Sequence, residues 1–123
     1  MGMMYTRATL AFRPRNFVNT DLQQLTQALR EFASARNWEE FHSPKNLASA
    51  LSVEAAELLE HFQWLTEAQS RNLPADKRAE IGTEIADVLL YLLQLADKLG
   101  IDVIEAARGK MLVNARKYPA PPA

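Results

Sequence analysis

The stretch EIGTEIADVLLYLLQLADKLG, residues 80–100, decides the fold of this chain. Its apolar residues recur every three or four positions, which is the period of an α-helix. The predicted stripe consists of Ile81, Ile85, Val88, Leu92, Leu95 and Leu99. Leu89, Leu90 and Leu93 make other sides of this helix apolar as well. We therefore expect a helix that is central in a bundle or covered by another subunit, and that ends at Gly100 as a left-handed C′ residue.

Three further helices are predicted around the central one, over about residues 21–36, 44–65 and 103–118. Ser43 and Pro44 mark the start of the second helix, because Ser caps free N–H groups and Pro suits the first helical position. Asp76 and Asp102 are the predicted caps of the third and fourth helices, and residues 66–75 between the second and third form a predicted polar loop. No strand signal or repeat is present. The expected fold is all-α, an antiparallel four-helix bundle.

Length and composition restrict the class of protein. A chain of 123 residues suits one domain, which we place at residues 20–119, after an irregular arm (1–19) and before a Pro/Ala tail (120–123). The absence of cysteine excludes disulfides, thiolate zinc sites and cysteine nucleophiles. A net charge of −1 gives no field to attract nucleic acid, and no apolar run approaches the length of a membrane span. We expect a cytoplasmic protein that binds neither nucleic acid nor membrane.

Two helices carry acidic residues where apolar ones are expected. The stripe of the second helix consists of Leu47, Leu51, Leu58, Phe62 and Leu65. Glu54 falls inside that stripe, and Glu57 lies about 60° to its side by helical geometry. On the central helix, Glu84 borders the stripe and Asp87 continues the same edge. If the two helices pack antiparallel, these i, i+3 pairs gather four carboxylates into one cluster.

Four carboxylates together are costly, because each loses solvation and like charges repel. A hard divalent cation removes both costs, and an all-oxygen ligand set favours Mg²⁺ or Mn²⁺ over zinc or copper. Such a site suits phosphate chemistry, since Mg²⁺ keeps open positions for phosphate oxygens. The alternative is that both acidic pairs lie on solvated helix faces, and the spacing by itself leaves this open.

Other polar and aromatic residues could contact a nucleotide. Lys110, Asn114 and Lys117 share one face of the last helix, where they could contact a polyphosphate. Alternatively, the two lysines only cover the edge of the bundle with their aliphatic stems. The flanking aromatics Trp38, Trp64 and Tyr91 could stack on a base, or could belong to the core or an interface. His42 and Asn46, at the start of the second helix, form a candidate anion-binding corner.

At these residues the sequence resembles the all-α nucleoside triphosphate pyrophosphatases, in particular the MazG-like dCTP pyrophosphatase branch. The resemblance covers about residues 22–119. It is carried by WEEFHSPKNLASAL (38–51), EAAELLEHFQW (54–64), EIADVLLYLLQLADKLGID (84–102) and KMLVNARKYP (110–119). The family hallmark, E-x-x-E followed after a spacer by E-x-x-D, is matched by Glu54, Glu57, Glu84 and Asp87.

The resemblance implies a function and a site. The expected reaction is Mg²⁺-dependent hydrolysis of dCTP, or of a related or modified pyrimidine nucleoside triphosphate, to monophosphate and pyrophosphate, as nucleotide house-cleaning. The four hallmark carboxylates would bind Mg²⁺, for which Mn²⁺ can substitute. Residues implied to contact the nucleotide are Trp38, Trp64, Lys110, Asn114, Lys117 and Tyr118. The active site is expected to span a subunit interface in a dimer or in a tetramer of two dimers.

Glu54 and Glu57 are the candidate catalytic residues, with Glu57 as the group that holds the attacking water. Three alternative functions can be distinguished from this one by their motifs or their behaviour in solution. A di-iron bundle needs two Glu-x-x-His motifs on helices, but Leu58 stands three residues before His61. A non-catalytic oligomeric regulator or adaptor would show no divalent-dependent stability. A dUTPase-like relative would differ only in its preferred base.

Overall fold

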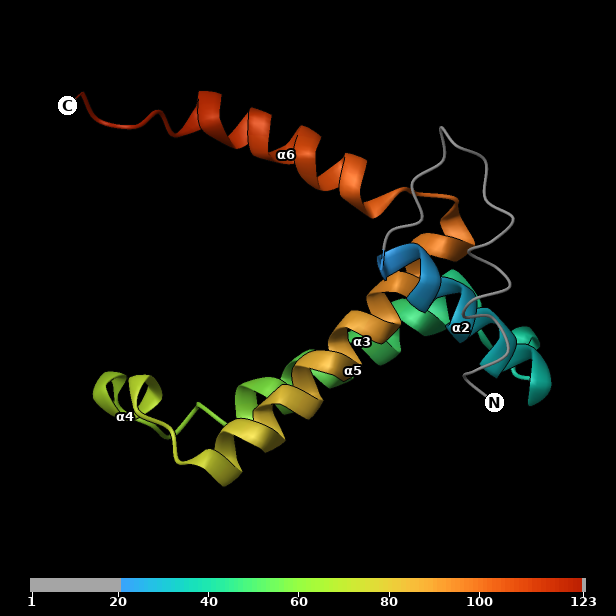
Figure 1. Cartoon of the computed structure of the whole chain (residues 1–123), viewed down its shortest axis with the longest axis horizontal. Coiled ribbons are helices and arrows are strands. Elements are labelled where there is room, and N and C mark those ends of the chain that lie inside the picture. The colour runs from blue at the N-terminus through green and yellow to red at the C-terminus, as the bar shows by residue number, and fades with distance from the viewer. Residues whose placement is uncertain (1–20, 123) are drawn as a thin grey trace.

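The computed structural model describes residues 21–122, so the predicted arm at 1–19 lies outside the described part. Between residues 21 and 122 the chain is helical and contains no β-strand. Its elements are α2 (Asp21–Ala35), the 3₁₀ helix η1 (Glu39–Phe41), α3 (Pro44–Glu60), α4 (Glu67–Arg71), α5 (Ala75–Leu99) and α6 (Val103–Lys117), shown in Figure 1. The all-α prediction is confirmed. None of the helices in this range combines the length and hydrophobicity of a membrane span.

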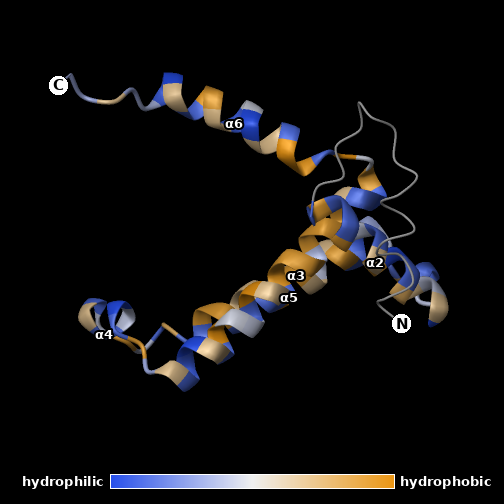
Figure 2. Cartoon of the chain, in the orientation of Figure 1, coloured by the Kyte–Doolittle hydropathy of each residue, from blue (hydrophilic) through white to orange (hydrophobic). Residues whose placement is uncertain are grey.

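The core lies where three helices meet. α3 runs antiparallel along α5, and α2 packs against the C-terminal part of α5 (Figure 1). Apolar residues are concentrated along α3 and α5 (Figure 2). Leu47 of α3 is only 1% exposed, and the other buried residues in the described part of the chain are Ala33, Ile81, Leu93 and Ala96. Full burial of a leucine side chain contributes about 2 kcal/mol, so the α3–α5 contact is the main support of the site described below.

Most predicted helix ends are correct, and their hydrogen bonds show why. The Ser43 hydroxyl accepts from the backbone N–H of Asn46 at 3.1 Å, with proline at the first helical position of α3. Gly100 ends α5 with φ of 67°. Asp102 Oδ1 accepts from the backbone N–H groups of Ile104 and Glu105, both at 3.0 Å, which starts α6.

The second helix is shorter than predicted. It ends at Glu60 rather than near Leu65, because the backbone bonds tighten there: His61 N–H reaches the Leu58 carbonyl and Phe62 N–H the Leu59 carbonyl. No glycine or proline marks this change, and the apolar spacing continues through it.

The predicted polar loop at 66–75 contains a short helix, α4. Thr66 and Gln69 form a reciprocal capping box at its start, a Thr-x-x-Gln signal that was present in the sequence. The prediction that Asp76 caps α5 is also wrong. Pro74 occupies the N-cap position without a side-chain bond, and Asp76 lies in the first turn, where its charge complements the helix dipole.

The buried face of α5 differs from the predicted stripe. Ile81, Leu93 and Ala96 are buried, whereas Ile85, Leu92 and Leu99 are exposed, at a spacing of seven residues. Because this helix is apolar on several sides, periodicity could not tell which side the chain itself covers. Because seven residues are close to two helical turns, the three exposed residues lie in a line along one face of α5.

The fourth helix does not pack beside the other three within one chain. α6 extends away from the α3–α5 pair (Figure 1), and none of its residues is buried. Its exposed apolar side chains include Met111, Leu112 and Val113. Within residues 21–122, the chain therefore has three packed helices, α2, α3 and α5, while the short α4 and the longer α6 project from them (Figure 1).

Candidate metal and nucleotide site

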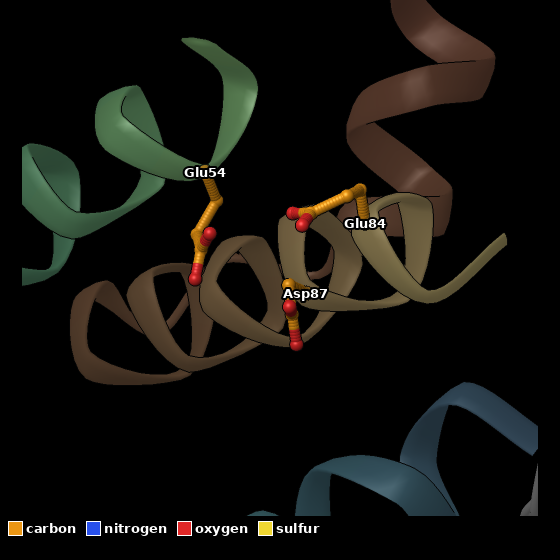
Figure 3. A group of neighbouring side chains, drawn as sticks. All are labelled: Glu54, Glu84 and Asp87. Carbon is orange, nitrogen blue, oxygen red and sulfur yellow. The ribbon is translucent and has the colours of Figure 1, made fainter. Parts of the chain in front are cut away.

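Three acidic side chains converge between α3 and α5. Carboxylate oxygens of Glu54, Glu84 and Asp87 all lie within 4.8 Å of one another. Figure 3 shows Glu54 reaching from α3 toward the helix that carries Glu84 and Asp87. The antiparallel packing of two helices with i, i+3 acidic pairs produces this convergence, as the spacing predicted. The three side chains are half-buried.

Glu57 stands beside this cluster. A side-chain hydrogen bond with Glu57 is the main reason that the pKa of Glu54 is raised from 4.5 to about 7, followed by burial and by repulsion from neighbouring carboxylates. Burial is the main cause that raises the pKa of Glu84, with repulsion from Glu57 and Asp87 next, while His61 acts in the opposite direction. All four predicted carboxylates thus influence one another.

The cluster has the character of a cation site. One carboxylate oxygen of Glu54 and one of Glu84, Oε2 in each case, is shielded from solvent and has no hydrogen-bond partner among residues 21–122. Such an orphaned acceptor costs about 1–3 kcal/mol, more if it is charged. A divalent cation would satisfy both oxygens and neutralise the repulsion. The all-oxygen donor set fits Mg²⁺ or Mn²⁺.

The aromatic and polar residues around η1 occupy one corner. The Trp38 ring lies 5.7 Å from that of Phe32 and 6.2 Å from that of His42, both in edge contacts. Trp38 remains 43% exposed, so one side of its ring is accessible. The Asn46 side-chain amide donates to the Phe41 carbonyl at 2.9 Å, which fixes the connector to the start of α3. Asn46 therefore has at least a structural role here.

The other predicted nucleotide residues are spread along the molecule. Tyr91 lies one turn after Asp87 on α5 and is half-buried. Trp64, in the turn after α3, is 86% exposed. Lys110, Asn114, Lys117 and Tyr118 are exposed on α6 and at its end, and α6 extends away from the carboxylate cluster of its own chain (Figure 1). The structure does not bring these four to the cluster within one chain.

Sequence reasoning missed a cavity of about 200 Å³ between α2, η1 and α5. Its walls include Thr26, Arg30, Glu39, His42, Gln94 and Asp97, of which only His42 had been singled out. Arg30 Nε donates to Asp97 Oδ2 at 2.8 Å across this cavity wall. These two residues are 67 positions apart in the sequence, and no spacing rule pairs them.

Comparison with known proteins agrees with this fold. The MazG-like family model matches residues 49–123. Human dCTP pyrophosphatase 1 is 41% identical over 101 residues, which are 80% of this chain and 59% of the human protein. Mouse dCTP pyrophosphatase 1 is 40% identical over 121 residues, 96% of this chain and 71% of the mouse protein. The chain thus spans less than two thirds of the human relative's length.

A crystal structure of a pyrophosphatase from Archaeoglobus fulgidus matches with a TM-score of 0.79 and 42% identity, over 87% of this chain and 100% of the archaeal one. The chain therefore shares its all-α fold with this archaeal pyrophosphatase. The chain belongs to the MazG-like family, in the branch that contains the dCTP pyrophosphatases. The names of these relatives agree with the expected enzyme class, a nucleoside triphosphate pyrophosphatase.

Proposed function

We propose that this chain hydrolyses a nucleoside triphosphate to the monophosphate and pyrophosphate with the help of Mg²⁺, and that dCTP or a related or modified pyrimidine nucleotide is its substrate. The observation that carries the proposal is the convergence of Glu54, Glu84 and Asp87 with two buried, unpartnered oxygens. The relatives named dCTP pyrophosphatase support the choice of reaction and base. A cytoplasmic, house-cleaning role stays a prediction.

In this proposal Glu54, Glu57, Glu84 and Asp87 hold the metal. Bound Mg²⁺, or Mn²⁺ in its place, would supply positive charge that offsets the charge of the triphosphate during reaction. Glu57 interacts with both Glu54 and Glu84, and so stands at the edge of the cluster where a water could be held. As general base it would orient that water toward the α-phosphorus and accept its proton. The α–β phosphoanhydride bond breaks, and pyrophosphate leaves.

The residues of α6 require a second copy of the chain in this proposal. α6 projects away from its own cluster, and its Lys110 and Lys117 carry charge opposite to that of the carboxylates. The exposed line of Ile85, Leu92 and Leu99 on α5 offers an apolar surface to another copy. A homo-oligomer, a dimer or a tetramer of two dimers, would bring α6 of one copy to the cluster of another. There Lys110, Asn114, Lys117 and Tyr118 would contact the nucleotide.

The aromatic residues complete the proposed site. Trp38 and His42 already lie together beside η1, and Tyr91 follows Asp87 by one turn. Trp38 lies before α3 and Trp64 after it, so Trp38 of one copy and Trp64 of another would enclose the base by stacking, which in nucleic-acid complexes contributes about 1–3 kcal/mol per base. His42 and Asn46 would line the entrance beside them.

The test is a panel of nucleoside triphosphates assayed for pyrophosphate release with Mg²⁺, with Mn²⁺ and with a chelator. We expect release that requires the metal and that is abolished in Glu54→Gln and Asp87→Asn, while the far-ultraviolet circular dichroism of both variants stays helical. Glu60→Gln is the matched control, because Glu60 is an exposed glutamate at the end of the same helix, outside the cluster.

An undiminished Glu54→Gln enzyme would refute the assignment. A non-catalytic helical oligomer would instead release no pyrophosphate from any triphosphate, show no divalent dependence of stability, and show no change in tryptophan fluorescence on addition of nucleotide. A dUTPase-like enzyme would favour dUTP over dCTP in the same panel.

A further inference from the structure

The cavity between α2, η1 and α5 lies in line with the carboxylate cluster. Gln94, in its wall, follows Asp87 by seven residues, which places it on the same face of α5 and two turns, about 10 Å, further along. Tyr91 stands between them on that face. A ligand whose phosphates meet the carboxylates therefore reaches the cavity with its opposite end. For a nucleotide that end is the base, a step that rests on the proposed function.

Several hydrogen-bonding groups of the cavity wall are already engaged. Arg30 directs Nε and one terminal nitrogen to Asp97, and its other terminal nitrogen donates to the Gln27 side chain at 2.9 Å. The Thr26 hydroxyl donates to the Leu22 carbonyl at 2.8 Å. These interactions fix the shape of the wall, and they leave few donors of the Arg30 guanidinium and the Thr26 hydroxyl free to bond a ligand.

Gln94 presents an acceptor. Its side-chain Nε2 donates to the Leu90 carbonyl at 3.2 Å, and the group is partly buried. This bond fixes the amide so that Oε1 is the atom left to accept from a ligand. The carboxylate of Glu39, in the same wall, adds a second acceptor, while Lys98 and His42 supply donors nearby. The wall thus offers acceptors and donors together.

We infer that Gln94 is a specificity-determining residue that accepts a hydrogen bond from the exocyclic amine of the base. Cytosine carries a donor amine at the position where uracil carries an acceptor carbonyl. A carbonyl placed against Gln94 Oε1 would leave two acceptors facing each other, and a site built to bond a donor rejects an analogue that lacks it. The pocket therefore favours cytosine over uracil nucleotides.

The test compares dCTP with dUTP in kcat/KM, and dCMP with dUMP in equilibrium binding, using the full chain with Mg²⁺. Gln94→Met keeps the shape of the side chain without its polar atoms. We expect it to lower the cytosine-to-uracil ratio roughly tenfold, through weaker binding of the cytosine nucleotide and with kcat little changed. Gln94→Glu keeps an acceptor at this position and is expected to retain cytosine preference. Thr83→Val is the control, because Thr83 is exposed on α5 outside the cavity wall, where its hydroxyl donates to the Ala79 carbonyl, and it should leave the ratio unchanged.

The outcomes separate the two proposals. If no triphosphate yields pyrophosphate but dCMP binds in preference to dUMP, and Gln94→Met removes that preference, the proposed reaction fails and the base assignment stands. An unchanged ratio in Gln94→Met, equal binding of dCMP and dUMP by the wild type, or no binding of either overturns the base assignment, whatever the reaction.

Discussion

Arg30 and Asp97 form a bidentate ion pair that joins α2 to the C-terminal end of α5. Arg30 Nε donates to Asp97 Oδ2 at 2.8 Å, and a terminal nitrogen of the same guanidinium donates to Oδ1. This hydrogen bonding holds the pKa of Asp97 below its ordinary value and raises that of Arg30. Because it also forms one wall of the cavity beside η1, the pair connects the stability of the fold to the shape of the candidate base pocket.

Removal of this pair should destabilise the chain modestly. We expect Arg30→Ala to lower the free energy of unfolding by about 1 kcal/mol at neutral pH. The bidentate ion pair is favourable, but its contribution is small because Arg30 is substantially exposed. The lowered pKa of Asp97 means that its contribution is present at neutral pH and is lost as the pH falls through that carboxyl's titration. Urea unfolding measures both effects. Arg71→Ala is the control, because its pair with Glu67 is exposed on both sides, and an equal loss there would contradict the assignment.

The acidic cluster predicts a pH dependence of the metal-free protein. The pKa of Glu54 is raised to about 7, so the folded state favours its protonated form. The stability from this preference is present below the ordinary value of 4.5 and is lost as the pH rises through about 7. In chelator, we expect the unfolding temperature of the wild type to fall between pH 4.5 and pH 7 relative to that of Glu54→Gln. If the unfolding temperatures of the two proteins change with pH in parallel, the raised pKa of Glu54 is contradicted.

The same cluster predicts an opposite response to metal. A cation binds the deprotonated carboxylates, so Mg²⁺ should raise the unfolding temperature more at pH 8 than at pH 6. Glu84→Gln should be more stable than the wild type in chelator at pH 8, because it removes a repulsive charge, but it should gain little from Mg²⁺. Glu60→Gln should behave as the wild type does in both conditions. A full Mg²⁺ response in Glu84→Gln would contradict this ligand set.

The left-handed residue after α2 predicts a local effect. Asn37 has φ of 56°, and the backbone N–H of Trp38 returns to the Ala33 carbonyl at 3.0 Å, which closes the helix end. Asn37→Gly should be neutral or slightly stabilising, whereas Asn37→Val should cost about 1–2 kcal/mol. Thermal unfolding of the two variants checks this order. The reverse order would show that the turn does not depend on the left-handed conformation.

The projecting α6 predicts complementation between subunits. Glu54→Gln lacks one carboxylate of the cluster, and a Lys110→Ala/Lys117→Ala double variant lacks two cations of α6. If α6 of one copy serves the cluster of another, a refolded mixture of the two should regain activity that neither has alone. Leu92→Glu, on the exposed line of α5, should lower the mass in light scattering and abolish activity together. A mixture that stays inactive would place Lys110 and Lys117 outside the shared site.

Local signals were sufficient for most of the fold. Ser43, Gly100 and Asp102 predicted helix ends because capping and the left-handed C′ position are set by nearest neighbours. The acidic convergence was predictable only on the condition that the two helices pack antiparallel, since the i, i+3 spacing then brings Glu54, Glu84 and Asp87 together.

What the sequence could not supply depends on tertiary packing. The side of α5 that the chain covers could not be selected, because apolar residues such as Ile85 and Leu93 lie on different faces with equal local signals. The projection of α6 and the cavity walled by Arg30 and Asp97 are likewise set by contacts far apart in the sequence. α4 differs, since its capping box at Thr66 was readable but was assigned to a loop.

Hydrolysis of dCTP in heavy-oxygen water with Mg²⁺, followed by mass analysis of both products, shows which phosphorus atom the water attacks. We expect equal amounts of dCMP and pyrophosphate, the heavy oxygen in dCMP alone, and no reaction in chelator or with Glu54→Gln. Heavy oxygen in pyrophosphate, release of dCDP and phosphate, or turnover that persists in chelator would contradict the proposed reaction.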